Sequence, residues 1–221
     1  MIRTDEDIKK DIIDSLYWDS RIDVSNINVE VNEKKVILTG NVPTYLAKNA
    51  ATDNAILVEG VISVVNNLIV TIPSSLEIPD DNEIKRRVND LLLFNPDIDS
   101  TDIIVSSEDG IVTLSGNVDA FWKKTRAEEL AYNIFGVWDV INELTIVPSN
   151  DIDDKIIADD IMASLKRKST VDEEFIDVEV DNGNVTLTGE VLDWIAYKDA
   201  ENAAKFTLGV IDVINDIVIR I

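Results

Sequence analysis

The chain has 221 residues, of which 45% are hydrophobic and 29% charged, and its formal net charge is −23. It contains no cysteine and no histidine, which excludes disulfides, thiol catalysis, Ser-His-Asp catalysis and the usual zinc sites. Because nucleic-acid binding draws most of its affinity from Lys and Arg on phosphates, we expect no nucleic-acid partner for a chain of this charge.

The same pattern occurs three times along the chain. The copies read INVEVNEKKVILTG from Ile27, IIVSSEDGIVTLSG from Ile103 and IDVEVDNGNVTLTG from Ile176. They are 76 and then 73 residues apart (27 to 103, 103 to 176), which is the length of a small domain rather than of a solenoid repeat. We therefore expect a first domain at 1–72, a linker at 73–79, a second domain at 80–148 and a third at 149–221.

A predicted helix opens each repeat. Acidic residues stand at its start, where free backbone amides and the positive end of the helix dipole favour them. They are Asp5-Glu6-Asp7, Asp80-Asp81, and Asp151, Asp153 and Asp154. Apolar residues then recur every four positions, as on one face of a helix. They are Ile8, Ile12 and Leu16, then Ile84, Val88 and Leu92, then Ile157, Ile161 and Leu165.

Two strands joined by a tight turn come next. Their apolar residues alternate with polar ones, as in half-buried strands. Gly110 and Gly183 stand in the turns of the second and third repeats, where glycine suits a left-handed backbone conformation. Lys34 takes that place in the first repeat, so we expect a different turn type there or a slightly strained one.

A second helix and a last strand complete each repeat. The helix carries alanines four residues apart, which would let it lie close to a sheet, and a glycine ends it. The pairs are Ala51/Ala55, Ala127/Ala131 and Ala200/Ala204, and the glycines are Gly60, Gly136 and Gly209. The predicted last strands are Val64 to Ile72, Val140 to Val147 and Val213 to Ile221.

The resulting fold class is α+β, an α/β sandwich of three tandem α-β-β-α-β domains. A β-α-β crossover returns the last strand parallel to the second. Each domain should therefore have a small three-stranded mixed sheet with two helices on one face.

The residues common to the three copies resemble the BON domain, a module of bacterial osmotic-stress and nodulation proteins. They are a strand and turn, the pattern V-x-L-S/T-G, a helix with spaced alanines, and the pattern G-V-x-x-V-V/I-N. The resemblance covers almost the whole chain and implies the same α-β-β-α-β fold. It also implies binding rather than catalysis, since several members are associated with anionic phospholipid or the cell envelope and one cytoplasmic relative binds potassium.

One cluster runs against the overall acidity: Trp122, Lys123, Lys124 and Arg126, at the expected start of the second helix of the middle repeat. An aromatic ring beside cations is what an interfacial lipid anchor requires, so this cluster is a candidate surface for phospholipid headgroups. The alternative is ordinary packing, because the preceding Phe121 occupies the position of Tyr45 and Trp194 and would belong to the core.

Two further tryptophans are candidates for an interface with a partner or between repeats. Trp138 stands where the other repeats have Ile62 and Ile211, and Trp18 lies at the end of the first helix. The acidic run Asp172-Glu173-Glu174 is a weak candidate for a cation, with a plain charged loop as the alternative. We expect no catalytic residues, no metal site and no cofactor.

These observations favour a non-enzymatic bacterial stress-associated protein that acts as a binding module or scaffold. One alternative is a peripheral protein that binds anionic phospholipid, and another is a cytoplasmic protein that responds to K⁺ or Ca²⁺. The expected partners are phospholipid headgroups or another protein, and the repeats should pack on one another. No transmembrane or signal-peptide pattern is present, so we expect a cytoplasmic location, or a periplasmic one if a leader had been removed.

Overall fold

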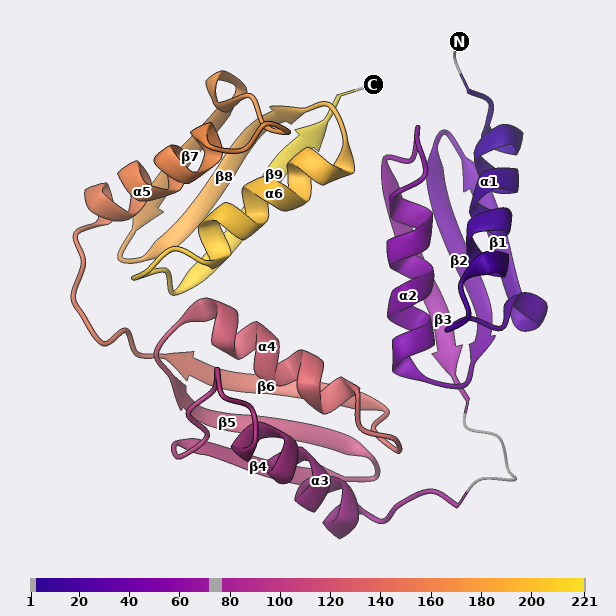
Figure 1. Cartoon of the computed structure of the whole chain (residues 1–221), viewed down its shortest axis with the longest axis horizontal. Coiled ribbons are helices and arrows are strands. Elements are labelled where there is room, and N and C mark those ends of the chain that lie inside the picture. Colours follow the sequence, from indigo (N-terminus) through magenta and orange to yellow (C-terminus); the bar gives the residue numbers. More distant parts are fainter. Residues whose placement is uncertain (1–2, 72–76, 221) are drawn as a thin grey trace. The chain divides into compact units, whose positions relative to one another are not determined.

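The computed structural model describes residues 3–71 and 77–220. Each of its three repeats contains a helix, two strands, a second helix and a third strand in chain order, as Figure 1 shows. The three expected α-β-β-α-β units are confirmed. The chain divides into two compact units, one formed by the first repeat up to Asp80 and one running from Asp81 to Arg220.

The helices and strands have closely matched lengths in the three repeats. The first repeat contains α1 (Asp5–Trp18), β1 (Ile27–Asn32), β2 (Lys35–Val42), α2 (Tyr45–Ile56) and β3 (Ser63–Val70). The second contains α3 (Asp81–Leu93), β4 (Ile103–Glu108), β5 (Ile111–Val118), α4 (Phe121–Tyr132) and β6 (Asp139–Ile146). The third contains α5 (Asp154–Lys166), β7 (Ile176–Asp181), β8 (Asn184–Val191), α6 (Trp194–Lys205) and β9 (Asp212–Ile219).

Short 3₁₀ helices, which the sequence did not predict, precede the first strand in two repeats. They are η1 (Val24–Asn26) and η2 (Glu173–Phe175). Two predicted strand ends, Ile72 and Ile221, lie outside the described residues, as does part of the predicted linker at 73–79.

Each sheet is mixed, and its middle strand pairs with both of the others. In the first repeat β1 is antiparallel to β2, and β3 is parallel to β2. The other two sheets have the same order, as the crossover argument predicts. Both helices of a repeat lie on one face of its sheet (Figure 1).

The core lies between that sheet face and the helices. The predicted helical faces are buried in full, as are both alanines of each predicted pair. Alanine at those positions lets the second helix approach the sheet closely. No polar or charged residue is buried in the described chain, so hydrophobic packing dominates each core.

The glycine at the end of the V-x-L-S/T-G pattern is required by backbone crowding. Gly40, Gly116 and Gly189 have φ angles of 121°, 109° and 129°. A Cβ on any of them would overlap the carbonyl oxygen of the residue just before the first strand, which is Phe175 in the third repeat. The glycine therefore allows this residue to lie against the middle strand.

The hairpin turns have one geometry in all three repeats, so the expectation of a different turn type at Lys34 is wrong. Glu33 and Lys34 have φ angles of 50° and 63°, and Asn182 and Gly183 have 50° and 76°. Two consecutive positive φ angles are typical of a type I′ turn. Lys34 thus adopts the left-handed conformation that glycine adopts elsewhere, which is the strained alternative.

An aspartate in the first turn of the first helix holds each hairpin turn. Asp81 accepts hydrogen bonds from the amides of Asp109 and Gly110, both at 2.9 Å, and from the Ser107 hydroxyl at 2.7 Å. Asp5 and Asp154 accept the equivalent two amide bonds in their own repeats. The acidic residues predicted to favour the helix start therefore also fasten the helix to the sheet.

Candidate functional site

The aromatic and basic cluster lies on the first turns of α4, where the sequence placed it. Lys123 Nζ is 5.7 Å from the centroid of the Trp122 ring and 2.7 Å from Asp119 Oδ1. Arg126 is paired with Glu129 at 3.1 Å. Two of the three cations therefore already have carboxylate partners, which reduces the positive charge available to a phosphate headgroup.

The Trp122 ring faces the third repeat. It lies 6.4 Å, centroid to centroid, from Phe206, which caps the end of α6. Phe121 packs against the cores of both repeats, and Ile211 of the third repeat packs against the core of the second. The cluster is thus part of a contact between the second and third repeats, and its lipid-binding function remains a prediction.

Trp138 covers a hairpin turn of its own repeat. A Cβ on Gly110 would collide with its ring, and its backbone amide donates to the Gly110 carbonyl at 2.9 Å. Ile211 has the same relation to Gly183. Trp138 is 39% exposed, so part of the ring is accessible to a partner, and its proposed interface function is untested.

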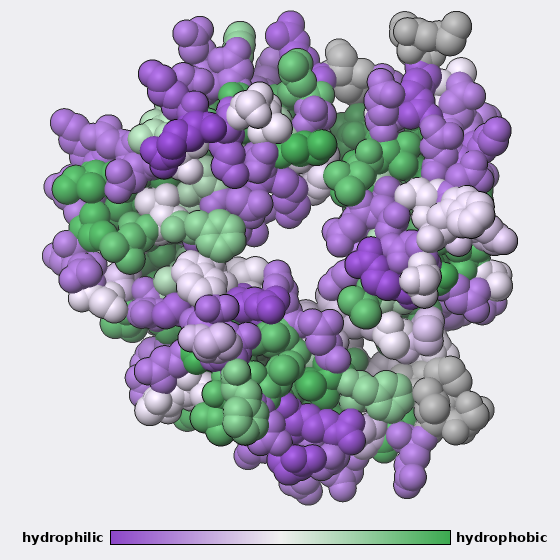
Figure 2. Space-filling model, viewed as in Figure 1, coloured by the Kyte–Doolittle hydropathy of each residue, from purple (hydrophilic) through white to green (hydrophobic). Residues whose placement is uncertain are grey.

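Trp18 is the most exposed of the candidate residues. It is the last residue of α1, is 82% exposed and stands edge-on to the Tyr17 ring at 5.4 Å. The equivalent residues of the second repeat, Leu93 and Phe94, are also exposed. Figure 2 shows hydrophobic residues interspersed among hydrophilic ones on the face it displays.

A surface hollow recurs at one place in the second and third repeats, where the end of the middle strand meets the start of the second helix. The hollow in the second repeat has a volume of about 340 Å³ and that in the third about 530 Å³. The first is lined by Asp99, Asp102, Asn117, Val118, Asp119, Lys123, Val147 and Ser149. The other includes Val171, Asp172, Glu173, Phe175, Glu190, Val191, Leu192, Ala196 and Arg220.

The two hollows differ in chemistry although they share a position. Residues 73 positions apart correspond, so Asp102 is replaced by Phe175 and Asp119 by Leu192. The hollow of the third repeat therefore has two large apolar side chains where that of the second has two carboxylates. Phe175 and Leu192 belong to no motif of the sequence, and the signal that marks them is that the aligned residues of the second copy are acidic.

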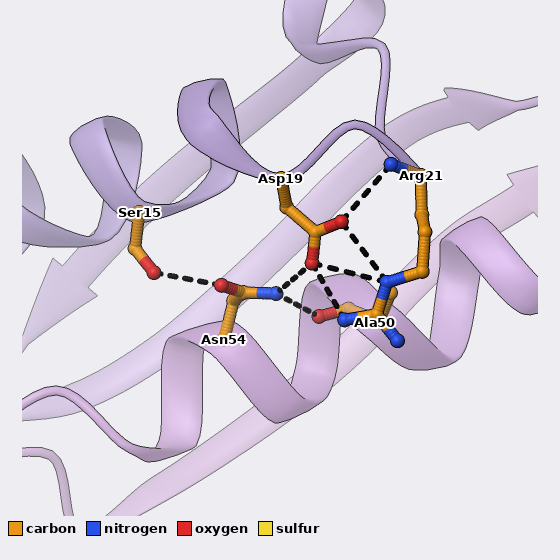
Figure 3. Close-up of polar contacts among 5 residues, drawn as sticks. All are labelled: Ser15, Asp19, Arg21, Ala50 and Asn54. Carbon is orange, nitrogen blue, oxygen red and sulfur yellow. Dashed lines mark hydrogen bonds and ion pairs between the residues drawn. The ribbon is translucent and has the colours of Figure 1, made fainter.

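A polar network joins the two helices of the first repeat (Figure 3). Ser15 donates to Asn54 Oδ1 at 2.7 Å, and Asn54 Nδ2 donates to Asp19 Oδ2 at 2.7 Å and to the Ala50 carbonyl at 2.8 Å. Hydrogen bonds from Arg21 hold the pKa of Asp19 well below its usual value. The hydrogen bonds from Ser15 and to Asp19 connect α1 and its C-terminal end to α2.

Within residues 3–71 and 77–220, no group of three or more acidic side chains converges in a way that could hold a metal ion. Asp172 accepts a hydrogen bond from the Glu174 amide and caps η2, so the acidic run has a structural function. The interpretation as a protein responsive to K⁺ or Ca²⁺ remains a prediction. No helix within residues 3–71 and 77–220 is long and apolar enough to cross a bilayer.

Comparison with protein families gives three matches to one domain. The BON domain matches residues 4–72, 80–148 and 153–221, which together make up nearly the whole chain.

Three curated relatives share this similarity. Osmotically-inducible protein Y of Escherichia coli is 28% identical over 204 residues, which are 90% of this chain and 97% of the relative. The outer membrane lipoprotein DolP of Haemophilus influenzae is 32% identical over 62% of this chain and 72% of its own. A 21 kDa hemolysin of Actinobacillus pleuropneumoniae is 29% identical over 65% of this chain and 74% of its own.

Among solved structures, the C-terminal domain of CdsD, a structural protein of the type III secretion system of Chlamydia trachomatis, is 19% identical. It aligns over 99% of this chain and 100% of that chain with a TM-score of 0.27. At that score the likeness supports no inference about function.

Proposed function

The chain belongs to the BON domain family, with three copies in tandem, and on that premise we propose that it is a non-enzymatic binding or scaffold protein of the osmotic-stress response. The observation that carries the proposal is its similarity to osmotically-inducible protein Y over 97% of that relative's length. The similarity covers 90% of this chain, so it is not confined to one of the three domains.

The positions of the acidic side chains agree with a function without catalysis. Asp81 holds a hairpin turn, and hydrogen bonds from Gly110 and Ser107 lower its pKa. Hydrogen bonds from Arg86 and Arg87 lower the pKa of Glu83 to about 2. A general acid or base needs a pKa near the working pH, and these shifts go the other way.

The stress function is tested in a bacterium that carries the gene. We expect the protein level to rise several-fold after an osmotic upshift with either sodium chloride or sucrose, and a deletion strain to recover growth more slowly. The empty vector and a plasmid with the intact gene are the controls. An unchanged protein level together with unimpaired recovery in both solutes would refute the proposal.

A second candidate function is binding to a membrane surface, and the exposed residues at the helix ends favour it. Trp18 with Tyr17, and Phe94 with Leu93, place aromatic and aliphatic side chains in solvent, as interfacial anchors do. One relative is by name an outer membrane lipoprotein. Because of this similarity, we propose the cell envelope as the location of the protein. The comparisons give no support to the expected cytoplasmic location.

Co-sedimentation with vesicles tests this second function and distinguishes its two possible sites. Vesicles with and without phosphatidylglycerol are compared at two salt concentrations. If the helix ends are the anchor, W18S and F94S together should reduce binding while K123E with K124E has little effect. The reverse result would favour the cluster on α4, and no sedimentation of the wild-type protein would exclude both.

A further inference from the structure

A close backbone contact shapes one side of the hollow of the third repeat, called the groove below. Gly189 in β8 allows the carbonyl of Phe175 to lie against it, and a Cβ there would overlap this oxygen. η2 is thereby fixed beside the end of β8, and Ala196 of α6 closes the groove from the other side. At about 530 Å³ the groove is in the size range of ordinary ligand sites.

The groove exposes large apolar side chains to water. Phe175 is 55% exposed and Leu192 is 81% exposed, whereas Val191 and Val171 beside them are buried. Burying such side chains would yield a favourable free energy in proportion to the apolar area covered. The second repeat has aspartates at both exposed positions, so the shared fold does not require apolar residues there.

The charged residues that line the groove, called its acidic rim below, are mostly carboxylates. Asp172, Glu173 and Glu190 line it, and its one cation is Arg220. Arg220 lies 3.6 Å from Glu190, with 67% and 56% of the two side chains exposed, and an ion pair that open is weak. The third repeat carries 7 basic and 17 acidic residues in 149–221, so its field also favours a cationic occupant.

We propose that this groove binds an extended peptide segment of a partner protein, with an apolar side chain seated on Phe175 and Leu192 and a neighbouring Lys or Arg paired with the acidic rim. The proposal deepens the binding function proposed above and rests on it. The acidic rim argues against an anionic lipid headgroup or a nucleic acid, because both would meet carboxylates. Exposed apolar side chains beside polar and charged ones are typical of protein interfaces.

The probe is a fluorescein-labelled peptide in which leucine and phenylalanine alternate with lysine, titrated with the full chain while anisotropy is measured. We expect saturable binding, weakened roughly tenfold by L192S and by F175S, as for residues at the centre of an interface. The matched control is I214S, which alters an exposed residue of β9 outside the groove and should bind like wild type. Circular dichroism confirms that each variant is folded.

Charge is tested separately. E173Q with E190Q should weaken binding several-fold at low salt, and a peptide with glutamate in place of lysine should bind several-fold less than the lysine peptide. Equal binding of both peptides, or equal loss in I214S and L192S, would overturn the proposal. So would failure of the lysine peptide to bind, or vesicle binding that L192S abolishes without any peptide binding.

The outcomes also distinguish this site from the stress function. L192S could abolish peptide binding in vitro while a strain that carries it recovers normally from osmotic upshift. The groove would then be a peptide site that the stress function does not require. A deletion strain without a phenotype would remove the stress function, while saturable peptide binding lost in L192S would still support the groove.

Discussion

Lys34 is the residue at which the first repeat carries backbone strain that the others avoid. Its φ of 63° costs a residue with a Cβ about 1–2 kcal/mol, whereas glycine adopts it freely. Glycine in turn has a greater conformational entropy in the unfolded state, which offsets part of the relieved strain. We therefore expect K34G to raise the free energy of unfolding of this repeat by about 0.5–1 kcal/mol. Chemical denaturation measures it, and G183K is the reverse control, expected to destabilise the third repeat.

Asp81 predicts a pH dependence whose sign follows from its hydrogen bonds. Hydrogen bonds lower the pKa of Asp81 in the folded state, mainly those from the Gly110 amide and the Ser107 hydroxyl. The ionised carboxylate therefore stabilises the fold, and this stabilisation is complete above the pKa of the unfolded state, about 3.9. That stabilisation is lost as the pH falls through the folded pKa. We expect the melting temperatures of wild type and D81N to differ at pH 7 and converge toward pH 2. D159N is the control, and a constant difference would contradict this explanation.

At the scale of the elements, one asparagine fastens the last strand to the second helix. In the second repeat Asn142 Nδ2 donates to the Lys124 carbonyl and to Glu128, both at 2.9 Å. In the third repeat the equivalent Asn215 Nδ2 is buried and has no partner among the described residues. The same side chain is therefore fully bonded in one copy and partly bonded in another.

The difference predicts unequal costs for the same substitution. N142A should destabilise its repeat by about 1–3 kcal/mol, since it removes these part-buried hydrogen bonds. N215A should cost about 1 kcal/mol less, because its amide nitrogen has no bond to lose. Urea titration followed by circular dichroism compares the two, and equal costs would show that the amide donor contributes little.

The elements themselves could be predicted because they depend on residues that all three copies share. The helix faces, the alanine pairs and the glycines recur at fixed spacing, and each has one physical cause in the fold. The turn at Lys34 was missed because the surrounding sheet imposes a left-handed conformation that the residue itself does not favour.

The candidate surfaces were harder to predict because they depend on residues that differ between copies. Ser15 and Asn54 hydrogen-bond across the helices of the first repeat, whereas the corresponding residues of the second are Leu91 and Leu130. Trp122 was identified from sequence as unusual, but its neighbour Phe206 lies 84 positions further along the chain, and no local pattern indicates that contact. Phe175 and Leu192 become notable only once the fold places them in one groove.

At the scale of the whole molecule, the contact between Trp122 and Phe206 joins the second and third repeats within one compact unit. An aromatic pair contributes about 0.5–1.5 kcal/mol beyond the area it buries. If this contact couples the two repeats, W122A and F206A should each lower the stability of residues 81–220, and the double variant should cost less than the sum of the singles.

A double-mutant cycle measures that coupling directly, because it cancels the effect of each substitution within its own repeat. We expect a coupling energy of about 0.5–1.5 kcal/mol and less cooperative unfolding of the second and third repeats in either variant. Strict additivity of W122A and F206A would mean that the rings lie close together without linking the stabilities of the two repeats.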